Sequence, residues 1–152
     1  MSLRIGIDPG ASGAIVVLHD SKIVDFLLMP IFKDGKSTRV NGAEVANFMR
    51  KYPGGHVYLE RVHSMPGQGV SSMFTFGHAA GLVQGVVTAL GHPMTLVSPQ
   101  TWKKRAGLLG TDKDAARSRA IQLFPSWEVL SKKGQGQALA DATLIAMYGA
   151  SD

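Results

Sequence analysis

The sequence predicts a single α/β domain over residues 1–152, with a mixed sheet of about five strands flanked by helices. Three apolar runs follow one another at hairpin spacing near the N-terminus, and two later runs each follow a helical pattern. The chain is long enough for one core, and its 45% hydrophobic and 18% charged content favours a folded chain. It has no cysteine, which excludes a disulfide framework and a thiolate metal site.

Apolar runs bounded by turn residues predict the five strands. In order, they cover residues 3–7, 14–19, 22–29, 56–62 and 93–98. Pro9-Gly10 ends the first run and Asp20-Ser21 makes a tight turn after the second, so we expect the first three strands as an antiparallel meander and the last two as parallel strands. Residues 30–40 are polar and contain Gly35, which predicts an exposed loop.

Helical spacing and end signals predict the helices. They cover residues 41 or 42 to about 51, 70–90, 101–109 (a short helix or turn), 112–124 and 137–148. Pro53 follows the first, Gly91 ends the second, and Thr111 is expected to cap the fourth, which Pro125 closes. Gly77, Gly81 and Gly85 form a stripe on the second helix that predicts close packing on the sheet, or else close approach of a second subunit.

Three carboxylates need an explanation because each lies in an apolar stretch. Asp8 ends the first strand, Glu60 lies near the end of the fourth, and Asp141 lies in the last helix. A charge beside buried elements is costly unless an ion or ligand offsets it, and close carboxylates repel one another without a cation. Oxygen ligands suit Mg²⁺, and Mn²⁺ is expected to substitute for it. Two such ions about 4 Å apart can support phosphodiester cleavage.

Each acid also has an ordinary structural explanation. Asp8 before Pro9-Gly10 is common turn chemistry, and Glu60 could pair with Arg61 or a lysine. Asp141 could be an ordinary residue near the N-terminus of a helix, where the helix dipole favours a negative charge. The apolar context that the three acids share favours their joint interpretation as metal ligands.

A basic segment and the net charge of +5 favour an anionic partner, nucleic acid first. The basic residues of this segment are Lys103, Lys104, Arg105, Lys113, Arg117 and Arg119. Lys113 and Arg117 share a helix face and could hold phosphates near the metal, where Lys113 could stabilise charge on the cleaved phosphate. An ordinary solvated helix face is the alternative interpretation.

At these motifs the sequence resembles the RuvC-like Holliday junction resolvases of the RNase H-like superfamily along nearly the whole chain. Ile5-Gly6-Ile7-Asp8-Pro9-Gly10 is similar to the first-strand motif of that family, Tyr58-Leu59-Glu60-Arg61-Val62 to its fourth-strand motif, and Ala140-Asp141-Ala142 to its C-terminal motif. The segment Pro99-Gln100-Thr101-Trp102-Lys103-Lys104, with Lys113 on a helix ending at Phe124-Pro125, resembles phage-type members.

The resemblance implies an RNase H-like fold and Mg²⁺-dependent nicking of branched DNA, such as four-way junctions, forks or flaps, by a homodimer. It implies Asp8, Glu60 and Asp141 as metal ligands and a cytoplasmic location in a bacterial or phage-infected host cell. Lys103, Lys104, Arg105 and Arg117 are expected to contact the DNA. Phe74 is expected to wedge into unpaired bases, although core packing is the alternative for this aromatic residue.

The chain departs from the family at Ala138, where a further Asp or His is usual. This departure keeps open a non-catalytic junction-binding protein of the same fold. A third alternative is an ATP-handling protein, because residues 8–13 also resemble the phosphate-binding hairpin of the actin-like and sugar-kinase superfamily. We expect no signal peptide, and no membrane span, since the apolar-rich stretch 70–90 is interrupted by polar residues and glycines.

Overall fold

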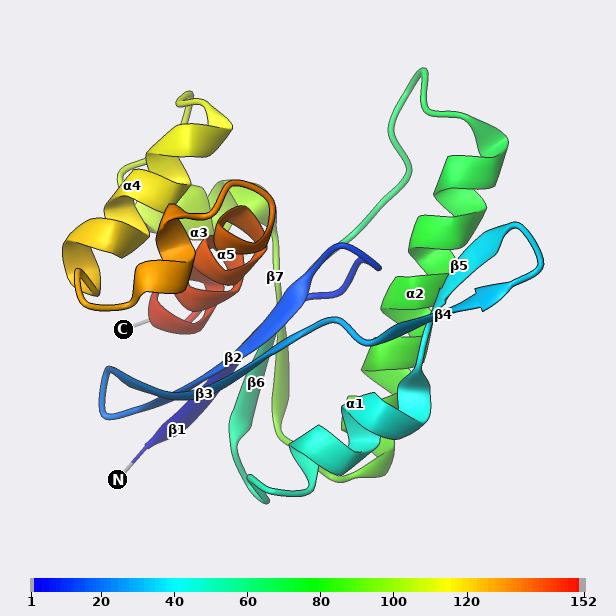
Figure 1. Cartoon of the computed structure of the whole chain (residues 1–152), viewed down its shortest axis with the longest axis horizontal. Helices are drawn as coiled ribbons and strands as arrows, with labels where there is room; N and C mark the ends of the chain where they lie inside the picture. The colour runs from blue at the N-terminus through cyan, green and yellow to red at the C-terminus, as the bar shows by residue number, and fades with distance from the viewer. Residues whose placement is uncertain (1, 151–152) are drawn as a thin grey trace.

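The computed structural model describes residues 2–150 as a five-stranded mixed sheet, a two-stranded hairpin and surrounding helices (Figure 1). The strands are β1 (Leu3–Asp8), β2 (Ala14–His19), β3 (Lys22–Leu28), β4 (Ile31–Asp34), β5 (Ser37–Val40), β6 (His56–Glu60) and β7 (Met94–Val97). The helices are α1 (Gly42–Met49), α2 (Val70–Ala89), α3 (Pro99–Arg105), α4 (Lys113–Leu123), η1 (Glu128–Ser131) and α5 (Gln135–Tyr148).

The main sheet has the strand order β3-β2-β1-β6-β7 and confirms the predicted mixed sheet. β1, β2 and β3 pair antiparallel, and both residues of the β2–β3 turn, Asp20 and Ser21, have positive φ angles of 49° and 67°. Such angles are typical of tight hairpin turns. β6 and β7 run parallel to β1 because each follows a helix that crosses back over the sheet.

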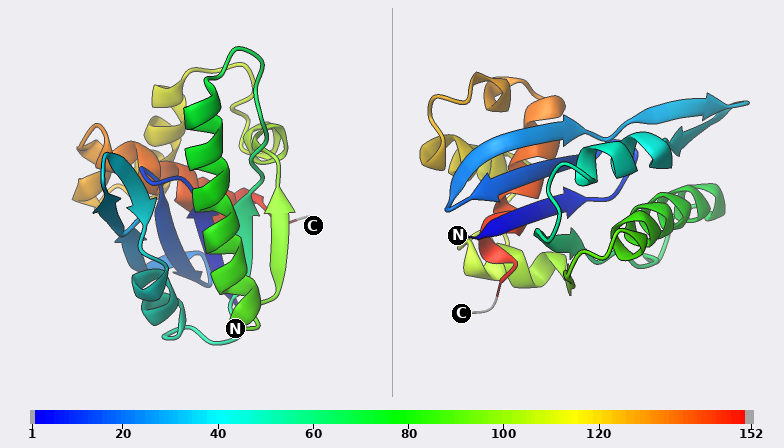
Figure 2. Two further views of the ribbon diagram at one scale, coloured as in Figure 1. Left: turned by 90° about the vertical axis from the view of Figure 1, so that its right-hand side faces the viewer. Right: turned by 90° about the horizontal axis from the view of Figure 1, so that it is seen from below.

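Helices cover both faces of the sheet, so that α2 lies in front of the strands and α5 behind them in the left panel of Figure 2. On the first face, Val45 of α1 and Val83 of α2 pack on Ile5 and Ile7. On the second face, α5 packs on β1 and β2, with α4 beside it, and Leu139 and Leu144 are fully buried there. The two faces together supply the apolar burial that stabilises the domain.

Helix α5 sits directly on the backbone of β1 at Gly6. A side-chain Cβ at this position would overlap the backbone of Ala142 and Ala146 in α5. The small residues of α5 on this face, including Ala138, are buried against the sheet. The absence of a side chain at Gly6 therefore fixes how near α5 lies to the strand that ends in Asp8.

Residues 30–40 are not the loop that their polarity predicts. β4 and β5 pair antiparallel as a hairpin beside α2, with Gly35 at φ 61° in its turn (Figure 1). Every residue of β4 is exposed, including Ile31 and Phe32. Because neither face of β4 is buried, its sequence lacks the apolar alternation that marks a half-buried strand, and the loop prediction was wrong.

Two other expectations about helices need correction. Gly77, Gly81 and Gly85 are exposed, and a Cβ at any of them would meet no atom within 4 Å, so they do not pack on the sheet. The alternative, close approach of a second subunit, stays a prediction. Asp112, not Thr111, caps α4, because its side chain accepts a hydrogen bond from the Ala115 backbone N–H at 3.0 Å. Among residues 2–150, no helix combines the length and apolar content needed to cross a membrane.

Candidate metal and nucleic-acid site

Strand register brings Asp8 and Glu60 to one edge of the sheet. β1 and β6 are parallel neighbours, with Ile7 opposite Leu59, so the last residues of the two strands, Asp8 and Glu60, come side by side. Ile7 and Leu59 point into the core under α1 and α2. Since side chains alternate along a strand, Asp8 and Glu60 point to the opposite face, which α5 covers.

Asp141 reaches the same region from α5. It precedes Ala142, whose backbone lies against Gly6, and Gly6 is two residues before Asp8. The charges of Asp8 and Glu60 both act on Asp141, and the charge of Asp8 acts on Glu60. The fold therefore gathers three acids that are far apart in the sequence.

Burial is the main cause of raised pKa values in all three acids. It raises the pKa of Asp8, against a hydrogen bond from the Gly10 backbone N–H at 3.4 Å. It also raises the pKa of Glu60, where the nearby Asp8 adds to the effect and a Trp102 hydrogen bond opposes it. For Asp141, burial followed by repulsion from Asp8 and Glu60 raises the pKa to about 7.

A divalent cation fits the chemistry of these three side chains. Within the described residues, none of the three acids forms an ion pair within 4.0 Å. Their partners include neutral donors instead: Trp102 Nε1 donates to Glu60 at 2.8 Å and Gln137 Nε2 to Asp141 at 3.0 Å. Half-buried carboxylates without a salt bridge leave negative charge that a cation bound by oxygen ligands would offset.

The three acids do not form one compact ligand set as placed. Among residues 2–150, no three Asp, Glu, His or Cys side chains are close enough to surround one metal ion. Asp8 lines a cavity of about 500 Å³ with Ser71, Ser72 and Thr75, whereas Glu60 and Asp141 line another of about 230 Å³. Joint metal binding by the three acids therefore stays a prediction.

Ala138 occupies the helix position at which the resemblance leads one to expect a further ligand. Its side chain is 7% exposed and packs in the core between α5 and the sheet. The neighbouring Gln137 instead holds Asp141 Oδ1. The helix therefore supplies a neutral hydrogen-bond donor to Asp141 from Gln137, and Ala138 adds neither a donor nor a charge.

The predicted basic residues divide into two groups by their contacts. Lys103 and Lys113 line the cavity that contains Glu60 and Asp141, and Lys104 is exposed on α3. Arg105 donates to the carbonyls of Tyr148 and Gly149 at the end of α5, each at 3.0 Å. Arg117 donates to the Ser131 carbonyl and pairs with Asp114. DNA contact by Arg105 and Arg117 stays a prediction, and both have a structural task within the chain.

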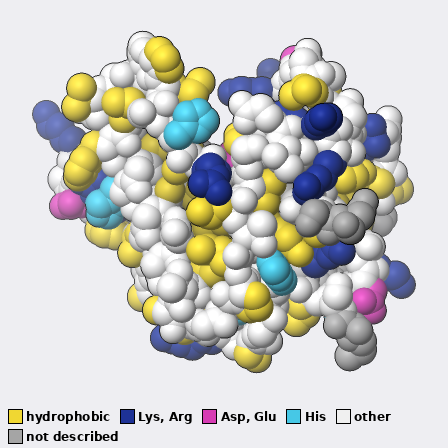
Figure 3. All heavy atoms as spheres, turned by 180° about the vertical axis from the view of Figure 1, so that it is seen from behind, with side chains coloured by type: hydrophobic (Ala, Val, Ile, Leu, Met, Phe, Trp, Pro, Cys, Tyr) yellow, Lys and Arg dark blue, Asp and Glu magenta, His cyan; other side chains and the backbone are white. Residues whose placement is uncertain are grey.

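Phe74 lies on the outside of α2 and is 63% exposed, so the alternative of core packing does not hold for it. The Arg39 guanidinium of β5 lies 5.7 Å from the centroid of its ring. Seen from behind, the surface is hollowed between the α2 side and the α3–α4 side, and Lys and Arg side chains lie along the hollow (Figure 3). The exposure of Phe74 leaves its ring free to contact a ligand.

Sequence reasoning missed the residues that hold the acids. Trp102 and Gln137 carry no motif for this role, and only the fold brings Trp102 against Glu60, 42 positions earlier. The spacing of four between Gln137 and Asp141 is the one signal that was available, because residues four apart share a helix face.

The raised pKa of Asp141 predicts a pH-dependent stability. Its pKa of about 7 in the folded chain exceeds the ordinary 3.8, so stability present below pH 3.8 is lost as the pH rises toward 7. Asp141→Asn does not titrate. Without metal, we expect the free energy of unfolding of this variant to exceed that of the wild type by an amount that grows from pH 4 to pH 7. Urea unfolding at several pH values measures it, and a pH-independent difference would contradict the assignment.

Comparison with known proteins gives the fold but no sequence family. No protein-family model matches the chain, and no curated protein sequence does. The structure resembles Thermus thermophilus RuvC in complex with a Holliday junction substrate, with a TM-score of 0.68 and 19% identity over 97% of this chain and 92% of that one. It also resembles a second Thermus thermophilus RuvC structure, with a TM-score of 0.62 and 16% identity over 97% of this chain and 95% of that one. The RNase H-like fold is confirmed.

Proposed function

We propose that this protein is a metal-dependent endonuclease that nicks four-way junctions or related branched DNA. The observation that carries the proposal is the half-buried placement of Asp8, Glu60 and Asp141 near the ends of β1 and β6. Burial raises the pKa of all three acids, Asp8 adds to the effect at Glu60, and Asp8 and Glu60 add to it at Asp141. The likeness to a RuvC structure in complex with a Holliday junction substrate supports branched DNA as the substrate class.

The residues of the chain have distinct tasks in this proposal. Asp8, Glu60 and Asp141 hold Mg²⁺, or Mn²⁺ in its place. When bound, the cation supplies activation of a water nucleophile and stabilisation of the leaving 3′-oxygen. Lys103 and Lys113, which line the cavity with Glu60 and Asp141, neutralise the phosphate, and Lys113 stabilises the charge that develops on it.

The DNA extends from this edge across the hollowed surface. Lys104 contacts a backbone phosphate, and the exposed Phe74 stacks on unpaired bases at the junction centre. A homodimer would present two such sites for two opposed nicks. Sedimentation of the protein with and without a junction tests the dimer.

A cleavage assay tests the function directly. We expect the protein to nick a labelled four-way junction in Mg²⁺ or Mn²⁺, to stop when EDTA is added, and to leave a linear duplex of the same sequence intact. Tight junction binding without nicking in either metal would instead indicate a non-catalytic junction-binding protein. Thermal stabilisation by ATP without DNA binding would indicate the nucleotide-handling alternative.

A further inference from the structure

We propose that Trp102 is a positioning residue that fixes the Glu60 carboxylate through its indole N–H. The inference rests on the proposed function, because it takes Glu60 to be a metal ligand. Trp102 Nε1 donates to Glu60 Oε2 at 2.8 Å. The indole is a donor only, so it specifies which Glu60 oxygen faces inward and leaves the other oxygen for a ligand.

The Trp102 ring has little freedom to move. It is 1% exposed and lies in a cluster with Val97, Leu108, Ala116 and Leu144. A close-packed ring of this size changes its orientation only if its neighbours shift. The hydrogen bond therefore ties a flexible glutamate side chain to a rigid part of the core.

The start of α3 sets the position of the ring relative to the sheet. Val97 of β7 pairs directly with Glu60 of β6, and the next residue, Ser98, caps α3 by accepting from the Thr101 N–H at 3.1 Å. Pro99 at the first helical position favours the same geometry. Trp102 follows one turn later, so a short and well-defined path of chain connects the two partners.

A neutral donor is suited to this task. A lysine or arginine in its place would orient Glu60 but would also cancel the charge that attracts a cation. The Trp102 indole orients the carboxylate and leaves its charge unpaired. Lys103, whose ammonium lies 5.6 Å from the centroid of the Trp102 ring, lines the cavity with Glu60. Helix α3 thus couples a phosphate-binding lysine to the orientation of a metal ligand.

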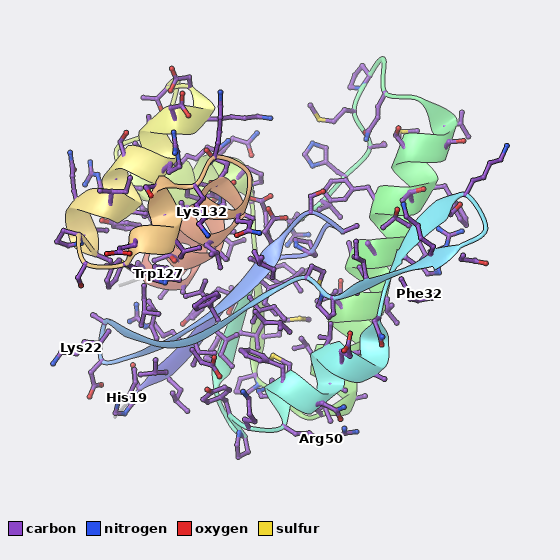
Figure 4. The ribbon with its side chains drawn as sticks, viewed as in Figure 1. His19, Lys22, Phe32, Arg50, Trp127 and Lys132 are labelled. Atoms are coloured by element: carbon purple, nitrogen blue, oxygen red, sulfur yellow. The ribbon has the colours of Figure 1, made fainter. Side chains whose placement is uncertain are left out.

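The first test compares Trp102→Phe with Trp127→Phe. Trp127 is the only other tryptophan and packs against Phe26 of β3 with ring centroids 5.2 Å apart, and Figure 4 shows it on the α4 side of the sheet. We expect Trp102→Phe to lower the nicking rate about 10- to 100-fold and to raise the Mg²⁺ concentration for half-maximal rate. Junction binding measured in EDTA should stay within about twofold of the wild type, and Trp127→Phe should match the wild type.

The second test needs neither activity nor metal. In the metal-free protein, Glu60→Gln should move the indole N–H NMR signal of Trp102, because an amide oxygen accepts a weaker hydrogen bond than a carboxylate, and should leave the Trp127 signal in place. An unmoved Trp102 signal would overturn the proposal. So would a Trp102→Phe variant with normal Mg²⁺ dependence, whether or not its stability falls. If the wild type nicks no branched DNA, the proposed function fails, while the NMR result still decides the contact.

Discussion

Asp8→Asn is expected to lower the rate of metal-dependent junction nicking by on the order of 10³-fold or more. Asparagine keeps the size of the side chain and an oxygen that can accept from the Gly10 N–H. It removes the negative charge that the cation requires at the junction of β1 with the following turn. The measurement is the single-turnover nicking rate of a labelled four-way junction at saturating Mg²⁺.

The same variant should be more stable than the wild type at neutral pH without metal. Burial raises the pKa of Asp8, so ionisation of this group destabilises the folded chain and its replacement by a neutral amide removes that cost. Asp20→Asn, in the exposed β2–β3 turn, is the control. It should leave the nicking rate unchanged and should not raise stability, because a hydrogen bond from the Ser2 N–H lowers the pKa of Asp20 and its negative charge favours the fold. Nicking by Asp8→Asn at the wild-type rate would contradict the proposed role of Asp8 as a metal ligand.

Gly6→Val is expected to lower the free energy of unfolding by about 3 kcal/mol or more. The added side chain would meet the backbone of Ala142 and Ala146, and a backbone of α5 held by its own hydrogen bonds cannot yield locally. Helix α5 would have to shift as a unit, which would also move Asp141 away from Asp8. Urea unfolding monitored by circular dichroism measures the loss.

Gly77→Ala is the matched control for this prediction. Gly77 is exposed within α2 and has open space where a Cβ would be, so alanine should raise stability by up to about 1 kcal/mol through its higher helix propensity. Equal stability of Gly6→Val and the wild type would mean that α5 does not lie on β1.

The strands and long helices were predictable because their apolar patterns match what the fold buries. The runs that became β1, β2 and β6 are largely buried in the sheet. The turn at Asp20-Ser21 was predictable because Asp and Ser are typical turn residues. The β4–β5 hairpin was not predictable, because an exposed two-stranded ribbon needs no apolar face. The exposure of Gly77 was also not predictable, because the spacing of glycines on a helix does not indicate whether that helix face is buried or exposed.

The partial burial of Asp8, Glu60 and Asp141 was predictable one by one because a carboxylate in an apolar stretch is unusual. Their hydrogen-bond partners were not, because Trp102 and Gln137 have equally ordinary explanations as a core residue and a polar helix residue. The sequence also does not distinguish basic residues that bind within the chain from those that line the site. Only the fold shows that Arg105 donates to the last carbonyls of α5, whereas Lys103 lines a cavity with Glu60.

The parallel pairing of β1 with β6 has a consequence for how such a protein can change over time. If β6 slipped by one residue, Leu59 would leave the core and Glu60 would turn into it, so one register error would disrupt both the core and the proposed metal site. Selection for a foldable chain therefore preserves the placement of these two acids at no additional cost. Loss of activity during evolution is then expected to come from replacing an acid, and not from a displaced strand.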